Sequence, residues 1–276
     1  MKKIILVTLL LVSNVCLLHG RLSAQARATE ITGILGAFGA EVALIHDKIE
    51  DKKEITLQNL RFTEGNLNGR HVVLAQTGMG KVNAAITTTL MLVHFKPHEI
   101  LFTGIAGGVD PKLVPGDIVI GSKVAYHDYG AITPDSMAHK PTHNPVDNSL
   151  NPFYFKCDDK LIALAQNVSS KLVLTKIGSI SRVPKIVTGI IVTGDVFVSS
   201  DAATIKLHSE MNAEATEMEG AAVGQTCFQQ SVPFLVIRSL SDSASNNAHE
   251  DVAAFYGVAA QNSAMMVMAV LGKLNK

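Results

Sequence analysis

Carboxyl side chains stand at three points of the sequence where apolar runs end, and there they could support acid–base chemistry on a small polar molecule. Glu41 follows the glycine-rich run GILGAFGA, Glu219 lies in ATEMEGAAV, and Asp242 ends VIRSLSD. Burial raises the pKa of a carboxyl, so Asp242 could hold a proton and act as a general acid. A carboxylate such as Glu219 can accept two hydrogen bonds at once, which suits the vicinal hydroxyls of a ribose.

Each of these carboxyls also has a purely structural explanation. Glu217 and Glu219 precede small residues at which a helix can begin, and the helix dipole favours acidic side chains there. Spacing alone favours that explanation for the pair. Asp242 lies in SDSA, a good helix start in which it fits an N-cap, although a cap can also be a general acid. The glycines before Glu41 are typical of a phosphate-binding turn, so an acid at that place needs a reason.

Nucleotide-phosphate motifs and metal sites have weak support. The glycines of GILGAFG are spaced G-x-x-G-x-x-G, unlike the dinucleotide fingerprint, and TGMGK lacks the earlier glycine of a P-loop. His127 with Asp128, and His139 with His143, raise the question of a metal. The second spacing suits ligands only on a helix, however, and Pro141 lies between the two histidines. We therefore expect no metal and no cofactor.

Alternating apolar runs and helical patterns must position the candidate side chains. The alternation predicts a mixed or mostly parallel sheet flanked by helices, and open α/β sheets bind ligands at their strand ends. Strands are predicted over 31–37, 71–78, 99–108, 186–197 and 232–242, with a strand pair in 116–128, and helices over 40–48, 81–95, 159–171, 203–211 and 253–274.

A polar stretch interrupts this alternation. Between Tyr129 and Asn151 the sequence is rich in Pro, His, Asn, Asp and Ser, which predicts an exposed insertion or lid loop. No internal repeat and no linker is evident. We therefore predict one domain over 29–276, with a polar loop insertion at about 129–152.

Composition limits the classes of partner. The chain has 276 residues, of which 47% are hydrophobic and 17% charged, enough for one large core. Its 24 basic residues balance 24 acidic ones, so no net field attracts nucleic acid or an anionic membrane. Of the three cysteines, Cys157 and Cys227 follow the leader described next; two buried thiols are favoured over one bridge.

The N-terminus has the layout of a secretory leader. Lys2 and Lys3 precede an apolar run, 4–18, and small residues with A-x-A patterns follow. A membrane anchor is the alternative, but about 15 apolar residues are short for a span of about 20. We predict a signal peptide over 1–26, export to the periplasm or the medium, and no membrane attachment after cleavage.

Seven motifs in fixed order carry a family resemblance that spans the whole chain after the leader. They are GILGAFGAEV, TGMGKVNAA, TGIAGG, GDIVIGSKVAYHD, VTGDVF, ATEMEGAAV and VIRSLSD. Together they resemble the purine nucleoside phosphorylase/nucleosidase superfamily, and within it they are most similar to the methylthioadenosine/S-adenosylhomocysteine nucleosidases. The resemblance implies a three-layer α/β/α sandwich with a central mixed, mostly parallel sheet. It also implies a homodimer that acts on a purine nucleoside without a cofactor.

The resemblance also implies roles for individual residues. Glu41 matches the carboxylate that activates the attacking water, and Asp242 matches the acid that protonates purine N7 as the base departs. Glu219 matches the group that binds the ribose hydroxyls. The implied substrate-binding residues are Glu219, Met218 beneath the sugar, Arg238 near the ribose, Phe197 and Val198 at the purine, Ile105, and Ser241.

Water is expected to be the nucleophile. Superfamily phosphorylases hold phosphate with arginines, one of them just upstream of the glycine turn, whereas this chain has EILFTG there. Glu41 would also repel phosphate at the point of attack. Ile105, Val252 and the long polar loop depart from the nucleosidase pattern, so hydrolases of adenosine, inosine or futalosine-like nucleosides stay open. A phosphorylase of other specificity and a non-catalytic nucleoside-binding protein are the alternatives.

Overall fold

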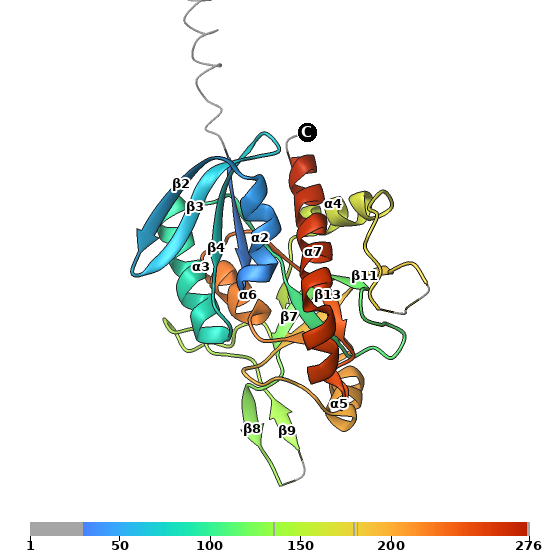
Figure 1. Cartoon of the computed structure of the whole chain (residues 1–276). Coiled ribbons are helices and arrows are strands. Elements are labelled where there is room, and N and C mark those ends of the chain that lie inside the picture. Colours follow the sequence, from blue (N-terminus) through green and yellow to red (C-terminus); the bar gives the residue numbers. More distant parts are fainter. Residues whose placement is uncertain (1–29, 135, 179, 181, 275–276) are drawn as a thin grey trace, which may run out of the picture. The chain divides into compact units, whose positions relative to one another are not determined.

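An eleven-stranded mixed sheet runs through the part of the chain that the structure describes (Figure 1). The structure is a computed structural model that describes residues 30–274 except 135, 179 and 181, so the predicted signal peptide over 1–26 lies outside the described residues. The strands, in spatial order, are β10 (Phe155–Lys156), β7 (Ile118–Tyr126), β11 (Ile186–Thr193), β12 (Ala213–Glu217), β6 (Ile105–Gly108), β13 (Phe234–Asp242), β5 (Glu99–Phe102), β1 (Ile31–Gly36), β4 (Arg70–Gln76), β3 (Leu60–Leu67) and β2 (Glu50–Leu57).

The middle strand, β13, connects the two halves of the sheet. Its start pairs in parallel with β5, its centre pairs antiparallel with β7, and its end pairs in parallel with β6. Because β7, β11, β12 and β6 also pair in succession, these strands and β13 form a closed ring. All nine residues of β13 are buried: its first four residues are apolar, and its second half carries the polar residues Arg238, Ser239, Ser241 and Asp242 into the interior.

Helices cover the sheet in two groups. The long α7 packs on β13 and lies beside α2 and α4, whereas α3 packs beside α6, and α5 packs on β12 (Figure 1). The described helices are α2 (Gly39–Lys48), α3 (Lys81–Phe95), α4 (Asp159–Ser169), α5 (Asp201–Met211), α6 (Gly220–Gln229) and α7 (Ala248–Leu274). The predicted α/β/α class with a central mixed sheet is thereby confirmed.

The apolar length of α7 is explained by burial within the domain. By length and composition this helix could cross a membrane, but half of its most apolar window is buried. It packs on β13, α2 and α4, which accounts for its Ala- and Met-rich sequence. Cys157 and Cys227 are both buried free thiols, as favoured from the sequence.

Three segments differ from the sequence-based expectation. The stretch 116–128 forms one nine-residue strand, β7, because Gly121 continues the strand instead of turning it. The predicted strand 99–108 is two short strands, β5 and β6, which both pair with β13 but have β1 and β12, respectively, on their other side. The hairpin β2–β3 was missed because β2 is an exposed edge strand without apolar alternation.

The polar loop contains a small hairpin of its own. Strands β8 (Gly130–Ile132) and β9 (Met137–His139) pair with each other and not with the main sheet. Most of the described residues of 129–152 are exposed or half-buried, in keeping with an insertion outside the core.

Candidate active site

A cavity of about 420 Å³ opens at the carboxyl ends of β1, β12 and β13, where the alternating pattern places a ligand site. Four carboxyl side chains line it: Glu41, Glu217, Glu219 and Asp242. All four are buried, yet they come from distant parts of the sequence. Each carboxyl has different hydrogen-bond partners, and these partners suit it to a different chemical role.

Glu41 is fixed by backbone N–H groups from two elements. Its Oε2 accepts from the N–H of Ala37 at 2.5 Å and of Phe38 at 3.3 Å, and its Oε1 accepts from the N–H of Ile105 at 2.9 Å. Glycine is required at position 104, because a Cβ there would lie 2.7 Å from Oε1. Burial raises the pKa of Glu41, opposed by the charge of Arg238 and by the backbone donors. A carboxylate held this way can serve as a base.

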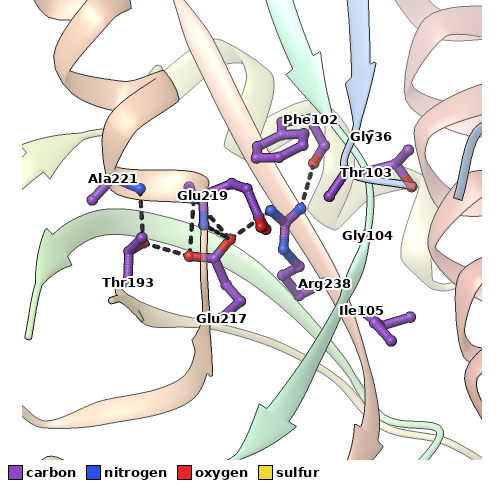
Figure 2. A network of polar contacts seen from close by, with 12 residues as sticks. Gly36, Phe102, Thr103, Gly104, Ile105, Thr193, Glu217, Glu219, Ala221 and Arg238 are labelled. Carbon is purple, nitrogen blue, oxygen red and sulfur yellow. Dashed lines mark hydrogen bonds and ion pairs between the residues drawn. The ribbon is translucent and has the colours of Figure 1, made fainter. Parts of the chain in front are cut away.

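A buried ion pair joins Glu217, which lines the cavity, to Arg238, which does not (Figure 2). Arg238 is 1% exposed, and its Nη2 donates to Glu217 Oε2 at 2.6 Å. Its Nη1 donates to the carbonyls of Phe102 at 3.4 Å and Ile237 at 3.2 Å, and the guanidinium carbon lies 4.0 Å from the centroid of the Phe102 ring. The guanidinium therefore faces protein groups on several sides.

Glu217 also fixes the start of α6. Its carboxylate accepts from the N–H of Gly220 at 2.8 and 2.9 Å, from the N–H of Glu219 at 3.2 Å and from the hydroxyl of Thr193. The expectation of an acid stabilising a helix N-terminus thus applies to Glu217. Glu219 makes no such cap contact, so its side chain is available for another role.

Glu219 extends instead to the turn before α3. Its Oε1 accepts from the N–H of Gly80 at 2.8 Å. Burial and the neighbouring charge of Glu217 raise its pKa well above the ordinary value, and Arg238 opposes the rise. A carboxyl under these conditions binds neutral hydroxyl groups more readily than anions.

Asp242 has the environment of a proton donor. Its Oδ2 accepts from the hydroxyl of Ser241 at 2.8 Å, and its Oδ1 accepts from the N–H of Ala244 at 2.7 Å. Burial raises its pKa, with these two hydrogen bonds opposing. The N-cap explanation is wrong for this residue, because α7 begins only at Ala248.

The predicted binding residues fall into two groups. Phe197, Met218, Glu219, Ile105 and Ser241 line the cavity, and the Phe197 ring lies 4.5 Å from that of His249. Two others lie elsewhere. Arg238 does not line the cavity, and its guanidinium donates to Glu217, which does. The Val198 side chain packs against a secondary core cluster, so contact with a ligand would have to come from its backbone.

Sequence reasoning missed several lining residues. Glu217 was noticed only as half of a pair. Met79 and Thr216 lie within the motifs TGMGKVNAA and ATEMEGAAV but were given no role, and no motif contains Tyr256. The spacing of Glu217 and Glu219 around Met218 was an available signal, since two acids that flank one lining residue can both reach a cavity.

Of the residues considered for a metal, Asp128 lies in an ion-pair cluster, whereas His139 lies 3.6 Å from Glu210 and His143 contacts the carbonyl of Asn148. Lys81 Nζ donates to both carboxylate oxygens of Asp128 at 2.7 Å, and Asp128 also accepts from the N–H of Asp195 at 2.8 Å. Asp195 in turn accepts from the N–H of Lys81 at 2.8 Å. This cluster joins the turn before α3 to the loop that carries Phe197. Among the described residues, no group of three or more His, Cys, Asp or Glu could hold a metal ion.

Comparison with known proteins gives consistent matches over the same region. The phosphorylase superfamily model matches residues 31–272. The chain is similar to the 5′-methylthioadenosine/S-adenosylhomocysteine nucleosidase of Neisseria meningitidis in complex with methylthio-immucillin-A, with 32% identity, 88% of this chain and 99% of that chain covered, and a TM-score of 0.76.

Two further solved structures widen the comparison. The corresponding nucleosidase of Colwellia psychrerythraea in complex with adenine has 35% identity, with 89% of this chain and 96% of that chain covered, and a TM-score of 0.76. The futalosine hydrolase of Helicobacter pylori has 28% identity, with 90% of this chain and 100% of that chain covered, and a TM-score of 0.75.

Replacing Arg238 should destabilise the protein strongly. We expect Arg238→Met to lower the free energy of unfolding by about 3–5 kcal/mol, because Glu217 would be left buried without its cation. The double variant Arg238→Met/Glu217→Gln should recover part of that loss. Urea unfolding measures both values.

An exposed ion pair supplies the matched control. Lys156 and Asp159 lie 2.6 Å apart with side chains 67% and 74% exposed, so Lys156→Ala should cost less than about 1 kcal/mol. Equal losses for the buried and the exposed pair would contradict the role assigned to Arg238.

Proposed function

This chain belongs to the phosphorylase superfamily, and from that premise we propose that it is a purine nucleosidase that hydrolyses the N-ribosidic bond of 5′-methylthioadenosine, S-adenosylhomocysteine or a related adenosine. The products are the free base and the ribosyl compound. One observation carries the proposal. A buried carboxyl with a raised pKa, Asp242, shares a cavity with Glu41, a carboxyl fixed by three backbone N–H groups.

The chemistry follows from the charges that develop. As the bond between C1′ and N9 breaks, its electrons pass to the base and the sugar becomes cationic. Asp242 delivers its proton to purine N7, which neutralises the leaving base. Glu41 accepts a proton from water as the water oxygen bonds to C1′. Glu219 binds the ribose hydroxyls. The carboxylates that line the cavity stabilise the cationic sugar more than the neutral substrate.

Water suits this cavity better than phosphate. A phosphorylase must bind a dianion beside C1′, but the site presents Glu41, Glu217 and Glu219 there. Arg238 does not line the cavity, and its guanidinium is bonded to Glu217. Carboxylates around the point of attack would repel phosphate.

The apolar side of the cavity supports a nucleoside with an apolar 5′ substituent. Phe38, Met79, Val252 and Tyr256 line it, and a thioether fits such surroundings. The Neisseria and Colwellia relatives are named for methylthioadenosine and S-adenosylhomocysteine, which agrees with this choice. Adenosine, inosine and futalosine-like nucleosides are the competing substrates, and a non-catalytic nucleoside-binding protein is the competing function.

A substrate panel tests the function directly. We expect the purified protein to release free base from methylthioadenosine and S-adenosylhomocysteine faster than from adenosine or inosine, at equal rates with and without phosphate. Chromatography of base and sugar products measures this. Strict dependence on phosphate would contradict hydrolysis, and tight binding of an adenosine analogue without base release over hours would favour the binding protein.

Activity should fall at both high and low pH, because one catalytic carboxyl must be protonated and the other ionised. Asp242 acts in its protonated form, so activity is lost as pH rises through its pKa. Glu41 acts in its ionised form, so activity is lost as pH falls through its pKa. Because burial raises both pKa values, each limb lies at higher pH than an exposed carboxyl would give. A pH profile of kcat/KM measures the limbs.

Removing the acid should remove one limb and most of the rate. We expect Asp242→Asn to lose on the order of 100-fold or more in kcat, together with the alkaline limb. Adenine binding to the variant serves as the control for an intact cavity. A near-normal rate would exclude Asp242 as the acid.

We also propose that two copies associate through an apolar face on α3. Val82, Ile86 and Val93 are exposed at helical spacing along it, and the exposed Phe228 lies on the neighbouring α6. Apolar groups gathered on one surface support an interface.

Sedimentation at micromolar concentration tests this association. We expect twice the monomer mass for the wild type and a monomer for Val82→Glu/Ile86→Glu, because two charges would be buried without partners. Ile205→Glu alters an equally exposed residue on α5 and should leave the dimer intact. A monomeric wild type would refute the interface.

Export remains our proposal from the N-terminal sequence. The basic pair Lys2–Lys3, the apolar run and the small residues after it support a cleaved leader. The N-terminal sequence of protein recovered from the periplasm or the medium tests it, and an intact Met1 would contradict cleavage.

A further inference from the structure

One residue that lines the cavity, Thr216, carries a hydroxyl group without a hydrogen-bond partner among the described residues. Thr216 is 5% exposed, and its Oγ1 is buried without a partner among the described residues. The other hydroxyls nearby are engaged, since Thr193 donates to Glu217 and Ser241 donates to Asp242. Because buried hydroxyls almost always have partners, an unpartnered hydroxyl on a residue that lines a cavity points to a ligand atom.

Strand register places this hydroxyl relative to the proposed acid. Thr216 on β12 pairs with Gly107 on β6, and Gly107 pairs with Asp242 on β13. Adjacent strands lie about 4.8 Å apart, so the Cα atoms of Thr216 and Asp242 are separated by roughly 10 Å. The register shifts between Leu240 and Asp242, so the common side of these residues is given by the cavity, which all three of them line.

The glycine between them allows the side chains of Asp242 and Ala244 to approach its backbone closely. A Cβ at position 107 would lie 2.9 Å from Asp242 Oδ1 and 2.9 Å from the Ala244 Cβ, so a side chain there would compete for that space. The cavity is therefore lined by an acid at one end, by a residue with an unpartnered hydroxyl at the other and by a glycine between them. A flat bicyclic base can bridge such a span.

We propose that Thr216 is a base-recognition residue whose hydroxyl hydrogen-bonds a ring nitrogen, N1 or N3, on the purine edge away from N7. The inference rests on the proposed function, in which Asp242 engages N7. With N7 at Asp242, the opposite edge of the base faces Thr216. The unprotonated nitrogens on that edge are acceptors, and the threonine O–H is a donor. A carbon side chain of the same shape could not make this bond.

The test is binding of the free base, which needs no turnover. Adenine is titrated calorimetrically into the wild type, Thr216→Val and Thr216→Ser. We expect Thr216→Val to weaken adenine binding about fivefold to tenfold, because one neutral hydrogen bond is lost, and Thr216→Ser to bind within about twofold of the wild type. With 1-deazaadenine or 3-deazaadenine, whichever lacks the bonded nitrogen, wild type and Thr216→Val should bind equally.

Ser239 supplies the matched control. Its hydroxyl is also buried without a partner among the described residues, but Ser239 is not one of the described residues that line the cavity. Ser239→Ala should therefore leave adenine affinity within about twofold of the wild type. Thr216→Val should keep or raise the melting temperature, because it removes an unsatisfied hydroxyl, whereas a purely structural role would lower it.

The outcomes separate this inference from the function on which it rests. Adenine affinity unchanged in Thr216→Val, an equal loss for adenine and both deaza analogues, or no adenine binding to the wild type would each overturn it. If the wild type binds adenine with the expected sensitivity to Thr216 but releases no base from any nucleoside, the proposed hydrolysis fails and the role of Thr216 in base recognition stands.

Discussion

The buried ion pair between Arg238 and Glu217 is the interaction on which the rest of the site depends. Arg238 lies on the middle strand, β13, and Glu217 ends β12, so the pair joins two strands of the closed ring. Glu217 then binds the backbone N–H groups that begin α6, which positions Met218 and Glu219. The Arg238 charge also opposes the pKa rise of both Glu41 and Glu219. One cation thus favours the ionised form of several buried carboxyls.

Differences in local bonding let similar side chains take different roles. Glu217 is bonded to a guanidinium and to a helix N-terminus, which makes it a positioning residue. Glu41 receives three backbone N–H groups but no direct hydrogen bond from the guanidinium, so it is suited to act on water. Asp242 has a hydroxyl and one backbone N–H as partners, and burial dominates its pKa. Acid and base therefore arise from one residue class through environment alone.

The features of the fold and of the site that depend on local sequence pattern could be predicted from the sequence. The helix 81–95 was found with both its ends, because its apolar spacing is regular and Gly80 precedes it. The catalytic candidates Glu41 and Asp242 were visible because they end apolar runs. The place of Arg238 outside the cavity lining, the orphan hydroxyl of Thr216 and the Lys81–Asp128 cluster were not predictable, since they arise from contacts between segments far apart in the chain. The strand β2 was missed because an exposed edge carries no apolar signal.

The central claim is that the cavity keeps Asp242 protonated above the pH at which an ordinary aspartate ionises. The most direct measurement is the titration of its side-chain carboxyl by ¹³C NMR in the unliganded protein, with the resonance assigned by its loss in Asp242→Asn. The account predicts a pKa clearly above 3.8, the ordinary value for this group. A pKa at or below 3.8 would contradict it, because Asp242 would then be ionised and unable to give a proton to the departing base.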